Sequence, residues 1–228
     1  MKLAFYTCFY GSVNNDAFVI PDVPSTHYPC YYFTNNKTMC EKIAQLSAWV
    51  CIYDELFEES NDASVSCMMS KRVKVLPHLY SQLVTYDYLC FLDSKSGNVN
   101  VPFVEEIINE LFIHQNYAML LRQHWFIKDS VWSEFNESMK QERYLKERDK
   151  YLDYMVRQIV DEEFCDTTNI HCACGFIVRN MRHKVTREIN ELWFQHIEEC
   201  GIQDQISFFF VKQRFEGYIH AFCESPFC

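Results

Sequence analysis

The stretch KRVKVLPHLYSQLVTYDYLCFLDSKSGN, from Lys71 to Asn98, decides the fold expected for this chain. A basic, mildly helical segment leads into an apolar strand over 88–92, and that strand ends on a single carboxylate, Asp93. A turn signal, SKSGN, follows at once. Ligands bind at the carboxyl ends of buried strands in open α/β sheets. A carboxylate at that place, with Arg72 and Lys74 shortly before the strand, is what a site for a metal and a diphosphate requires.

Composition limits the classes of function that are open to the chain. Its 228 residues fit a single domain, and a hydrophobic content of 49% is enough for a real core. The net charge of −10 argues against nucleic-acid binding, which needs a basic face. The five glycines do not form the glycine-rich loops of dinucleotide-binding or P-loop proteins.

The twelve cysteines bear on the redox environment. Several of them, including Cys8, Cys51 and Cys90, lie inside apolar runs, where they are typical small buried side chains. The first residues lack the apolar core and the cleavage site of a signal peptide, and no stretch reaches the ~20 apolar residues of a membrane span. We therefore expect a cytoplasmic protein with free thiols and no membrane span; a disulfide framework is the alternative.

Strand and helix signals alternate along the chain, which predicts one α/β domain over 1–228 with a mixed, mostly parallel sheet flanked by helices. Pro77 is expected to break the second helix, and a turn is expected over 11–16. A long charged helix over 134–164 has a broken apolar stripe that includes Leu145 and Val156. Strands are expected over 2–10, 28–34, 48–53, 88–92, 117–122, 170–179 and 218–222, and the other helices over 37–46, 62–83, 102–112, 185–200 and 205–215.

Some of the polar residues allow both a structural and a functional interpretation. Asp93 is either a cap of its turn or a ligand for a metal or a sugar diphosphate. Lys74 and His78 share one helix face at a spacing of four residues, either as a solvated basic face or as part of a site. Asp204 is either the N-cap of the helix that follows it or a carboxylate for glycosyl transfer.

The segment His171-Cys172-Ala173-Cys174 has the appearance of a metal clip, but a zinc site needs four ligands and the chain has no second motif of this kind. Strand alternation places Cys172 and Cys174 on the same face, directed inward. A zinc-dependent interaction protein built on this segment is a minor alternative.

An ordered set of motifs resembles a group of GT-A-type glycosyltransferases found in plant cell-wall and mucilage proteins and, as small domains, in large algal viruses. The set covers nearly the whole chain. It consists of YTCFYG at 6–11, YFTN at 32–35, Arg72, Lys74, Pro77 and His78 before the strand that ends in Asp93, FIVRN at 176–180, Leu192-Trp193, and DQISF at 204–208.

The resemblance implies a nucleotide-diphospho-sugar-dependent glycosyltransferase with a carbohydrate acceptor. Thr7 and Asn35 would then frame the nucleoside. Arg72 and Lys74 would hold the diphosphate, and Asp93 would bind a metal or the sugar and ribose of the donor.

Two departures from the family pattern are visible: Asn35 replaces an acidic residue, and Lys95 replaces the second aspartate of a D-x-D metal motif. Mn²⁺ or Mg²⁺ is expected from the resemblance, although Lys95 itself can neutralise diphosphate charge. A catalytically silent module that binds nucleotides or sugars on the same fold is the alternative.

The resemblance also assigns residues to the acceptor side and to catalysis. Arg179 and His171 would shape the acceptor side. Asp204 would be the catalytic carboxylate, acting as a base or stabilising positive charge on the sugar, with His78 as the next candidate for the base.

Overall fold

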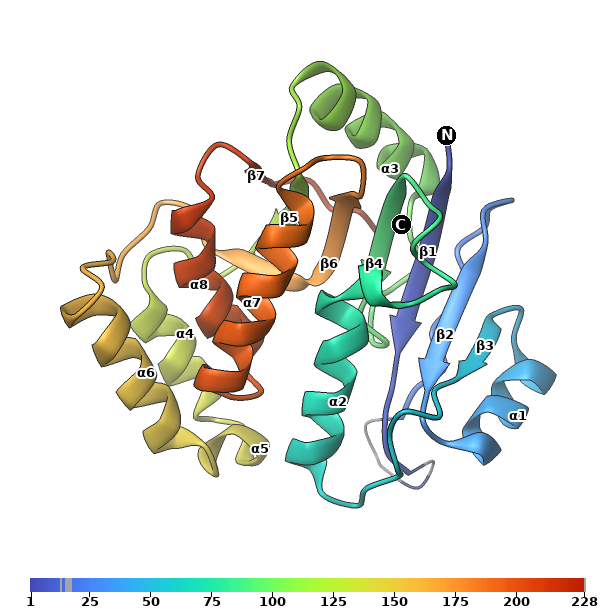
Figure 1. The fold of residues 1–228 in the computed structure, drawn as a ribbon, viewed down its shortest axis with the longest axis horizontal. Helices are drawn as coiled ribbons and strands as arrows, with labels where there is room; N and C mark the ends of the chain where they lie inside the picture. Colours follow the sequence, from blue (N-terminus) through green and yellow to red (C-terminus); the bar gives the residue numbers. More distant parts are fainter. Residues whose placement is uncertain (13, 15–17, 228) are drawn as a thin grey trace.

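The computed structural model describes residues 1–12, 14 and 18–227, so residues 13, 15 and 16 of the turn expected over 11–16 lie outside the described residues. The described chain forms one seven-stranded sheet in the order β3-β2-β1-β4-β6-β5-β7 (Figure 1). The strands are β1 (Leu3–Cys8), β2 (Cys30–Thr34), β3 (Val50–Tyr53), β4 (Tyr88–Leu92), β5 (Met119–Gln123), β6 (Cys172–Asn180) and β7 (Ile219–Phe222).

The strand directions confirm the mostly parallel, mixed α/β sheet. β1 is parallel to β2 and to β4, β2 is parallel to β3, and β5 is parallel to β7. Only β6 runs against both of its neighbours, β4 and β5. The carboxyl ends of β1 to β5 therefore lie along one edge of the sheet, and the amino end of β6 lies between those of β4 and β5.

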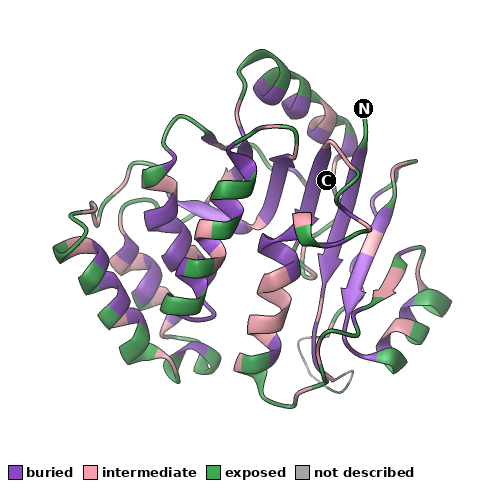
Figure 2. Cartoon of the chain, viewed as in Figure 1, coloured by how far each residue is buried: buried purple, intermediate pink, exposed green. Residues whose placement is uncertain are grey.

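Helices cover both faces of the sheet (Figure 2). The side chains of β1 alternate between these faces, and an apolar cluster lies on each face. Tyr6 belongs to the cluster beneath α2 (Ala63–Val75), α7 (Thr186–Cys200) and α8 (Asp204–Arg214). Phe5 belongs to the cluster beneath α1 (Lys37–Leu46) and α3 (Val101–Ile107). A 3₁₀ turn over Pro77–Leu79 follows α2, as expected from Pro77, and α3 continues as a π-helix over Ile108–His114.

The single charged helix expected over 134–164 is instead three helices, α4 (Val131–Ser138), α5 (Glu142–Leu145) and α6 (Arg148–Val160). An unbroken helix of that length would extend for about 45 Å. Folding it back places Phe135 of α4, Tyr144 of α5 and Tyr151 of α6 in one cluster with α8. The expected stripe is also wrong in part, because Leu145 and Val156 are exposed.

The buried stripe of α6 consists of Tyr151, Tyr154, Met155 and Gln158, which recur at the helical spacing of three, four and seven residues. These side chains pack toward α7 and α8. None of the described helices combines the length and the apolar character that crossing a membrane would require.

Candidate functional site

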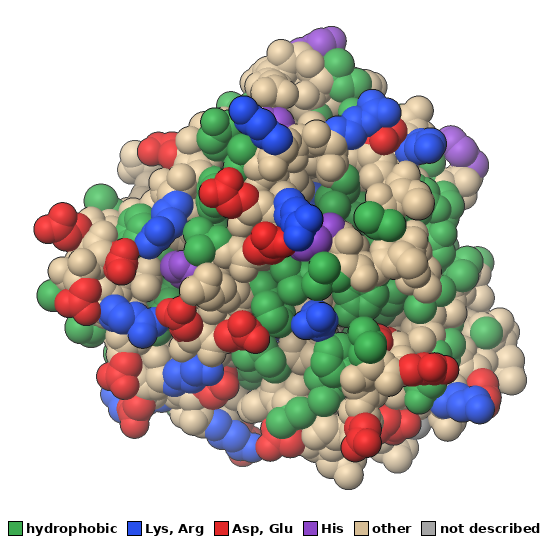
Figure 3. Space-filling model, in the orientation of Figure 1, with side chains coloured by type: hydrophobic (Ala, Val, Ile, Leu, Met, Phe, Trp, Pro, Cys, Tyr) green, Lys and Arg blue, Asp and Glu red, His purple; other side chains and the backbone are tan. Residues whose placement is uncertain are grey.

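A cavity of about 550 Å³ opens at the carboxyl edge of the sheet, beside the ends of β4 and β5 and the beginning of α8. Its wall contains five Lys and Arg side chains and four Asp and Glu side chains. They are Lys71, Lys74, Lys95, Arg122 and Arg143, and Asp93, Glu134, Glu137 and Asp204. The cavity is thus slightly cationic in a chain whose net charge is −10. On the face shown in Figure 3, charges of both signs are also interspersed.

Asp93 lies in the wall directly after β4, and its exposed side chain faces the cavity region. Its backbone N–H donates to the carbonyl of Gly175 on β6, at 2.8 Å. A Cβ atom at Gly175 would lie 3.5 Å from the Cβ of Asp93, an ordinary van der Waals contact. Oδ1 of Asp93 accepts the backbone N–H of Lys95 at 3.0 Å. Asp93 therefore closes its own turn and lines the cavity at the same time.

Two lysines of α2 bind the carboxylate of Asp204. Nζ of Lys71 lies 2.8 Å from Oδ2 of Asp204, and Nζ of Lys74 lies 2.5 Å from the same oxygen. All three side chains are largely buried. Two ammonium groups around one carboxylate leave a net positive charge at the cavity wall.

The charges in this triad shift the pKa values of Asp204 and Lys71. Burial by itself would raise the pKa of Asp204, but the positive charges of Lys71 and Lys74 outweigh it and lower the pKa to about 2. Burial would lower the pKa of Lys71, but the negative charge of Asp204 outweighs it and raises that pKa. Asp204 is therefore ionised throughout the physiological range of pH.

The turn between α7 and α8 brings Asp204 to this position. Gly201 ends α7 with a φ of 117°, and a Cβ there would lie 2.7 Å from Oε2 of Glu147 and 2.8 Å from Cε1 of Tyr151. The same Glu147 oxygen accepts the N–H of Ile202. Only glycine fits this close approach of α6 to the turn.

The N-cap of α8 is Gln203, whose side-chain oxygen accepts the N–H of Gln205 at 3.4 Å. Asp204 is the first residue of the helix and its carboxylate is bound to the lysines instead. The interpretation of Asp204 as a helix cap is therefore wrong. A local pattern cannot distinguish two adjacent polar residues at a helix start.

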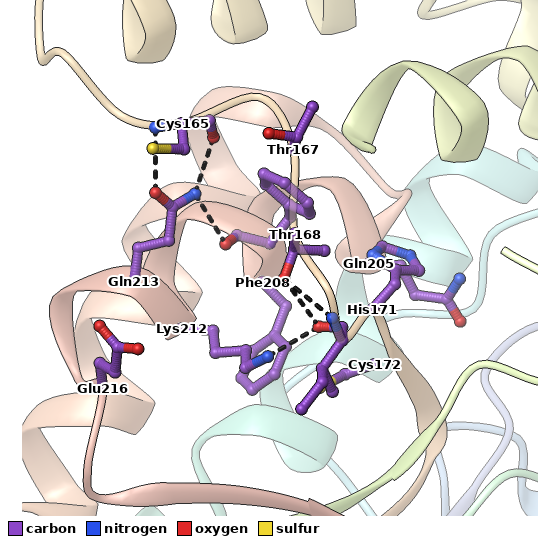
Figure 4. A pocket seen from close by; sticks show the side chains of 12 residues that line it. Cys165, Thr167, Thr168, His171, Cys172, Gln205, Phe208, Lys212, Gln213 and Glu216 are labelled. Carbon is purple, nitrogen blue, oxygen red and sulfur yellow. Dashed lines mark hydrogen bonds between the residues drawn. The ribbon is translucent and has the colours of Figure 1, made fainter. Parts of the chain in front are cut away.

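A buried polar network forms the wall on the side of α4. Glu134 accepts hydrogen bonds from Gln203 at 2.9 Å and from Ser138 at 3.3 Å. Nε2 of His171 lies 2.9 Å from its other oxygen. His171, expected on the acceptor side, therefore lies behind Glu134 and lines a smaller neighbouring cavity of about 220 Å³ between β6, α8 and the segment 165–172 (Figure 4).

Two expected donor residues lie elsewhere along the same sheet edge. Asn35 is buried, accepts the N–H of Gly11 at 3.0 Å and donates to the carbonyl of Glu58 at 2.9 Å, so it joins three loops. Thr7 is fully buried within β1. Neither residue lines the cavity.

Arg72 and His78 also lie off the cavity. Arg72 is adjacent to Lys71 on α2, and a helix directs neighbouring side chains about 100° apart. α2 ends at Val75, so the helical spacing expected between Lys74 and His78 is not maintained. His78 instead lies 3.5 Å from Glu191 of α7.

Arg179 has no exposed surface and lies between the sheet and α7. It donates to Tyr6 at 3.0 Å and to Asn190 at 2.9 Å, and its guanidinium lies 6.0 Å from the ring of Trp193. The Tyr6 hydroxyl donates to the carbonyl of Lys74 at 2.9 Å, and the indole N–H of Trp193 donates to the carbonyl of Asp204 at 3.3 Å. Arg179 thus supports the triad from behind and offers no contact to an acceptor.

Three basic residues of the cavity wall were not among the predicted site residues. Lys71, Arg122 and Arg143 all line the cavity. Arg122 was identifiable in principle, because it ends a predicted strand. Nothing in the sequence near Arg143 indicates a site.

Asp93 has a carboxylate oxygen that is free to bind a metal. Among the described residues, no group of three or more His, Cys, Asp and Glu side chains could hold a metal ion. Cys172 and Cys174 are both buried in the core and unpaired, on one face of β6 as expected. Oδ2 of Asp93 makes no hydrogen bond to the described residues, so it remains available to a divalent cation.

No protein-family model matches the chain, and no curated protein matches its sequence. Solved structures do match its fold. Mouse xyloside xylosyltransferase 1 in its apo form is 8% identical with a TM-score of 0.52, over 97% of this chain and 85% of that one. CMP:2-keto-3-deoxy-manno-octonic acid synthetase complexed with CTP is 10% identical with a TM-score of 0.51, over 98% of this chain and 90% of that one.

The bifunctional glycosyltransferase WbbM in its apo form is 10% identical with a TM-score of 0.51, over 97% of this chain and 38% of that one. At these identities the likeness shows the fold. The chain therefore has a GT-A-like α/β fold, which it shares with glycosyltransferases and with a synthetase whose structure contains CTP.

Proposed function

We propose that this protein is a glycosyltransferase that moves a sugar from a nucleotide-diphosphate sugar to a hydroxyl group of a carbohydrate acceptor. The observation that carries the proposal is the cationic cavity at the carboxyl edge of β4, within a chain of net charge −10. Membership of the plant and algal-virus group of GT-A enzymes is part of the proposal and rests on the ordered motifs.

The proposed chemistry is stabilisation of the leaving group. Lys74 and Lys71 hold a net positive charge with Asp204, and Lys95 adds an exposed ammonium from the loop after β4. Cations fixed beside a diphosphate attract it more strongly as its negative charge develops, so they lower the barrier for departure.

Asp204 remains the proposed catalytic carboxylate, in a restricted role. With a pKa of about 2 it is a weak base near neutral pH. It suits the stabilisation of positive charge on the departing sugar and the placement of the two lysines. A divalent cation, when bound, would supply further charge to the diphosphate, with Asp93 as its protein ligand.

Lys95→Ala tests the diphosphate site. Lys95 is exposed and makes no ion pair in the described structure, so its removal leaves the Lys71–Lys74–Asp204 triad intact. Calorimetry with UDP and GDP should show affinities weakened by about three- to tenfold, while binding of uridine and guanosine stays unchanged. Lys150→Ala, an exposed lysine of α6, is the matched control. Equal losses for diphosphates and nucleosides would contradict the proposal.

The catalytically silent binding module is the second candidate. The observation in its favour is that Asp204 is already neutralised by two lysines, which leaves no carboxylate poised as a free base there. A transfer and hydrolysis assay with a panel of nucleotide sugars separates the two. Nucleotide binding without turnover of any donor, with or without Mn²⁺, would favour the silent module.

A further inference from the structure

Two large aromatic side chains are exposed at the rim of the 550 Å³ cavity. Trp125 is 61% exposed and Phe126 is 55% exposed, and both line the cavity. Large aromatic side chains normally stabilise a protein by burial, so a pair left in contact with solvent at a cavity mouth makes little contribution to folding. Such pairs commonly mark a binding site.

Hydrogen bonds to His124 hold the loop that carries Trp125 and Phe126. His124 is buried, and its Nδ1 accepts the N–H groups of Phe126 at 3.4 Å and Ile127 at 3.1 Å. Burial lowers the pKa of His124, which favours the neutral imidazole that this acceptor role requires. The imidazole stacks on Trp125 with the ring centroids 4.5 Å apart and an interplanar angle of 19°. The aromatic rings are therefore presented in a preorganised arrangement.

The pair lies on the side of the cavity opposite to the proposed diphosphate site. Trp125 follows β5, whereas Asp93 and Lys95 follow β4, and β6 lies between these two strands. A ligand that extends from the diphosphate site across the amino end of β6 therefore reaches the aromatic rim. That is the place where an acceptor would have to approach the donor sugar.

The surroundings of the pair match a saccharide better than a lipid surface. Glu137, Gln141 and Arg143 line the same cavity and supply donors and acceptors for hydroxyl groups. The C–H bonds on one face of a sugar ring are weakly positive and pack against the negative face of an aromatic ring. The net charge of −10 opposes adsorption to an anionic membrane.

We propose that Trp125 and Phe126 form a stacking platform for the acceptor, and that this acceptor is a saccharide or a glycoside whose sugar ring packs on the indole of Trp125. The inference rests on the proposed function, because it takes the donor to be bound at Asp93 and Lys95.

Tryptophan fluorescence tests the platform directly. Trp49 and Trp193 are buried and Trp132 is half-buried, so Trp125 is the tryptophan most open to a ligand. The wild-type protein, saturated with UDP, is titrated with methyl glucoside, methyl galactoside, methyl mannoside and methyl xyloside. At least one glycoside should change the emission, and Trp125→Ala should abolish that change.

Calorimetry with the same glycoside then measures affinity. Trp125→Ala should weaken binding about tenfold, and Trp125→Phe should restore most of it, because a phenyl ring still stacks. UDP affinity and melting temperature should stay at their wild-type values. Tyr53→Ala, an aromatic side chain that is 41% exposed on β3 at the far edge of the sheet, is the matched control and should change nothing.

The outcomes separate this inference from the proposed function. Wild-type protein that binds UDP but responds to no glycoside refutes the platform and leaves the donor site standing. Protein that binds glycosides through Trp125 but binds no nucleotide refutes the proposed function and supports the platform. Loss of UDP binding in Trp125→Ala would show that the indole stacks on the nucleobase. If Trp125→Ala lost only the binding to phosphatidylcholine vesicles, the indole would be a lipid contact. Either result overturns the inference.

Discussion

Asp204→Asn is the substitution whose effect follows most directly from the structure. The change removes the negative charge that Lys71 and Lys74 share, and it leaves two buried ammonium groups facing each other. The pKa of Asp204 is about 2, compared with about 3.9 for an ordinary aspartate. At about 1.4 kcal/mol per pKa unit, the ionised form contributes roughly 2–3 kcal/mol to the free energy of unfolding at pH 7.

Breaking a buried ion pair by removing one partner typically costs about 3–5 kcal/mol, so we expect a loss between roughly 2 and 4 kcal/mol. For a chain of this size that lowers the melting temperature by roughly 5–15 °C. The assay is thermal or urea denaturation at pH 7, with Asp153→Asn as the matched control. Asp153 is exposed in the middle of α6, and its substitution should cost less than about 0.5 kcal/mol.

The dependence on pH gives a second readout. Because the folded-state pKa of Asp204 is below its unfolded value, its contribution is complete above about pH 4 and is lost as the pH falls toward 2. The stability difference between the wild type and Asp204→Asn should therefore shrink over that range. An Asp204→Asn protein that melts within 1–2 °C of the wild type at pH 7 would refute the buried triad.

Three other predictions address the site and the redox state. Asp93→Asn should leave the melting temperature unchanged and abolish the increase in UDP affinity that Mn²⁺ produces. It should also slow transfer by raising the activation barrier by about 2–4 kcal/mol. A variant whose UDP affinity responds to Mn²⁺ like that of the wild type would exclude Asp93 as the metal ligand. His78→Gln should keep kcat/KM within about twofold, because His78 lies off the cavity beside Glu191, and a large drop in kcat would return His78 to the catalytic candidates. All twelve cysteines should react with an alkylating agent in unfolded, non-reduced protein, because the eleven described cysteines are unpaired. If mass spectrometry finds several disulfides instead, the expected cytoplasmic location is wrong.

The sequence was sufficient to predict the order of the seven strands and the position of Asp93 at the end of β4, although not the division of the charged segment into three helices. The strand over 88–92 is a continuous apolar run that ends in a charged residue and a turn signal, and both signals are local. The break at Pro77 was predictable for the same reason, because proline removes a backbone donor wherever it occurs. The placement of Lys95 beside Asp93 follows from their separation of two residues.

The sequence was not sufficient to identify which of its basic residues belong to the site. Lys71 and Lys74 bind Asp204, a residue that follows them by 133 and 130 positions. Arg72 and His78, from the same segment, lie off the cavity. The side chain of Arg72 leaves α2 about 100° away from that of Lys71, and His78 lies beyond the end of α2 at Val75. The direction of each side chain depended on where the helix ended and on which distant helix packed against it.

Arg179 and Trp125 show that the burial of a side chain also depends on distant parts of the chain. Arg179 was expected to shape the acceptor side, yet it is fully buried because Tyr6 of β1 and Asn190 and Trp193 of α7 surround it. Trp125 was not among the predicted site residues, and it is exposed at the cavity rim because the loop after β5 folds around His124. Periodicity and turn chemistry are properties of neighbouring residues, so the sequence alone determined the strands and the end of β4. Burial and ion pairing depend on contacts between residues far apart in the chain, so only the tertiary structure decided which side chains line the cavity.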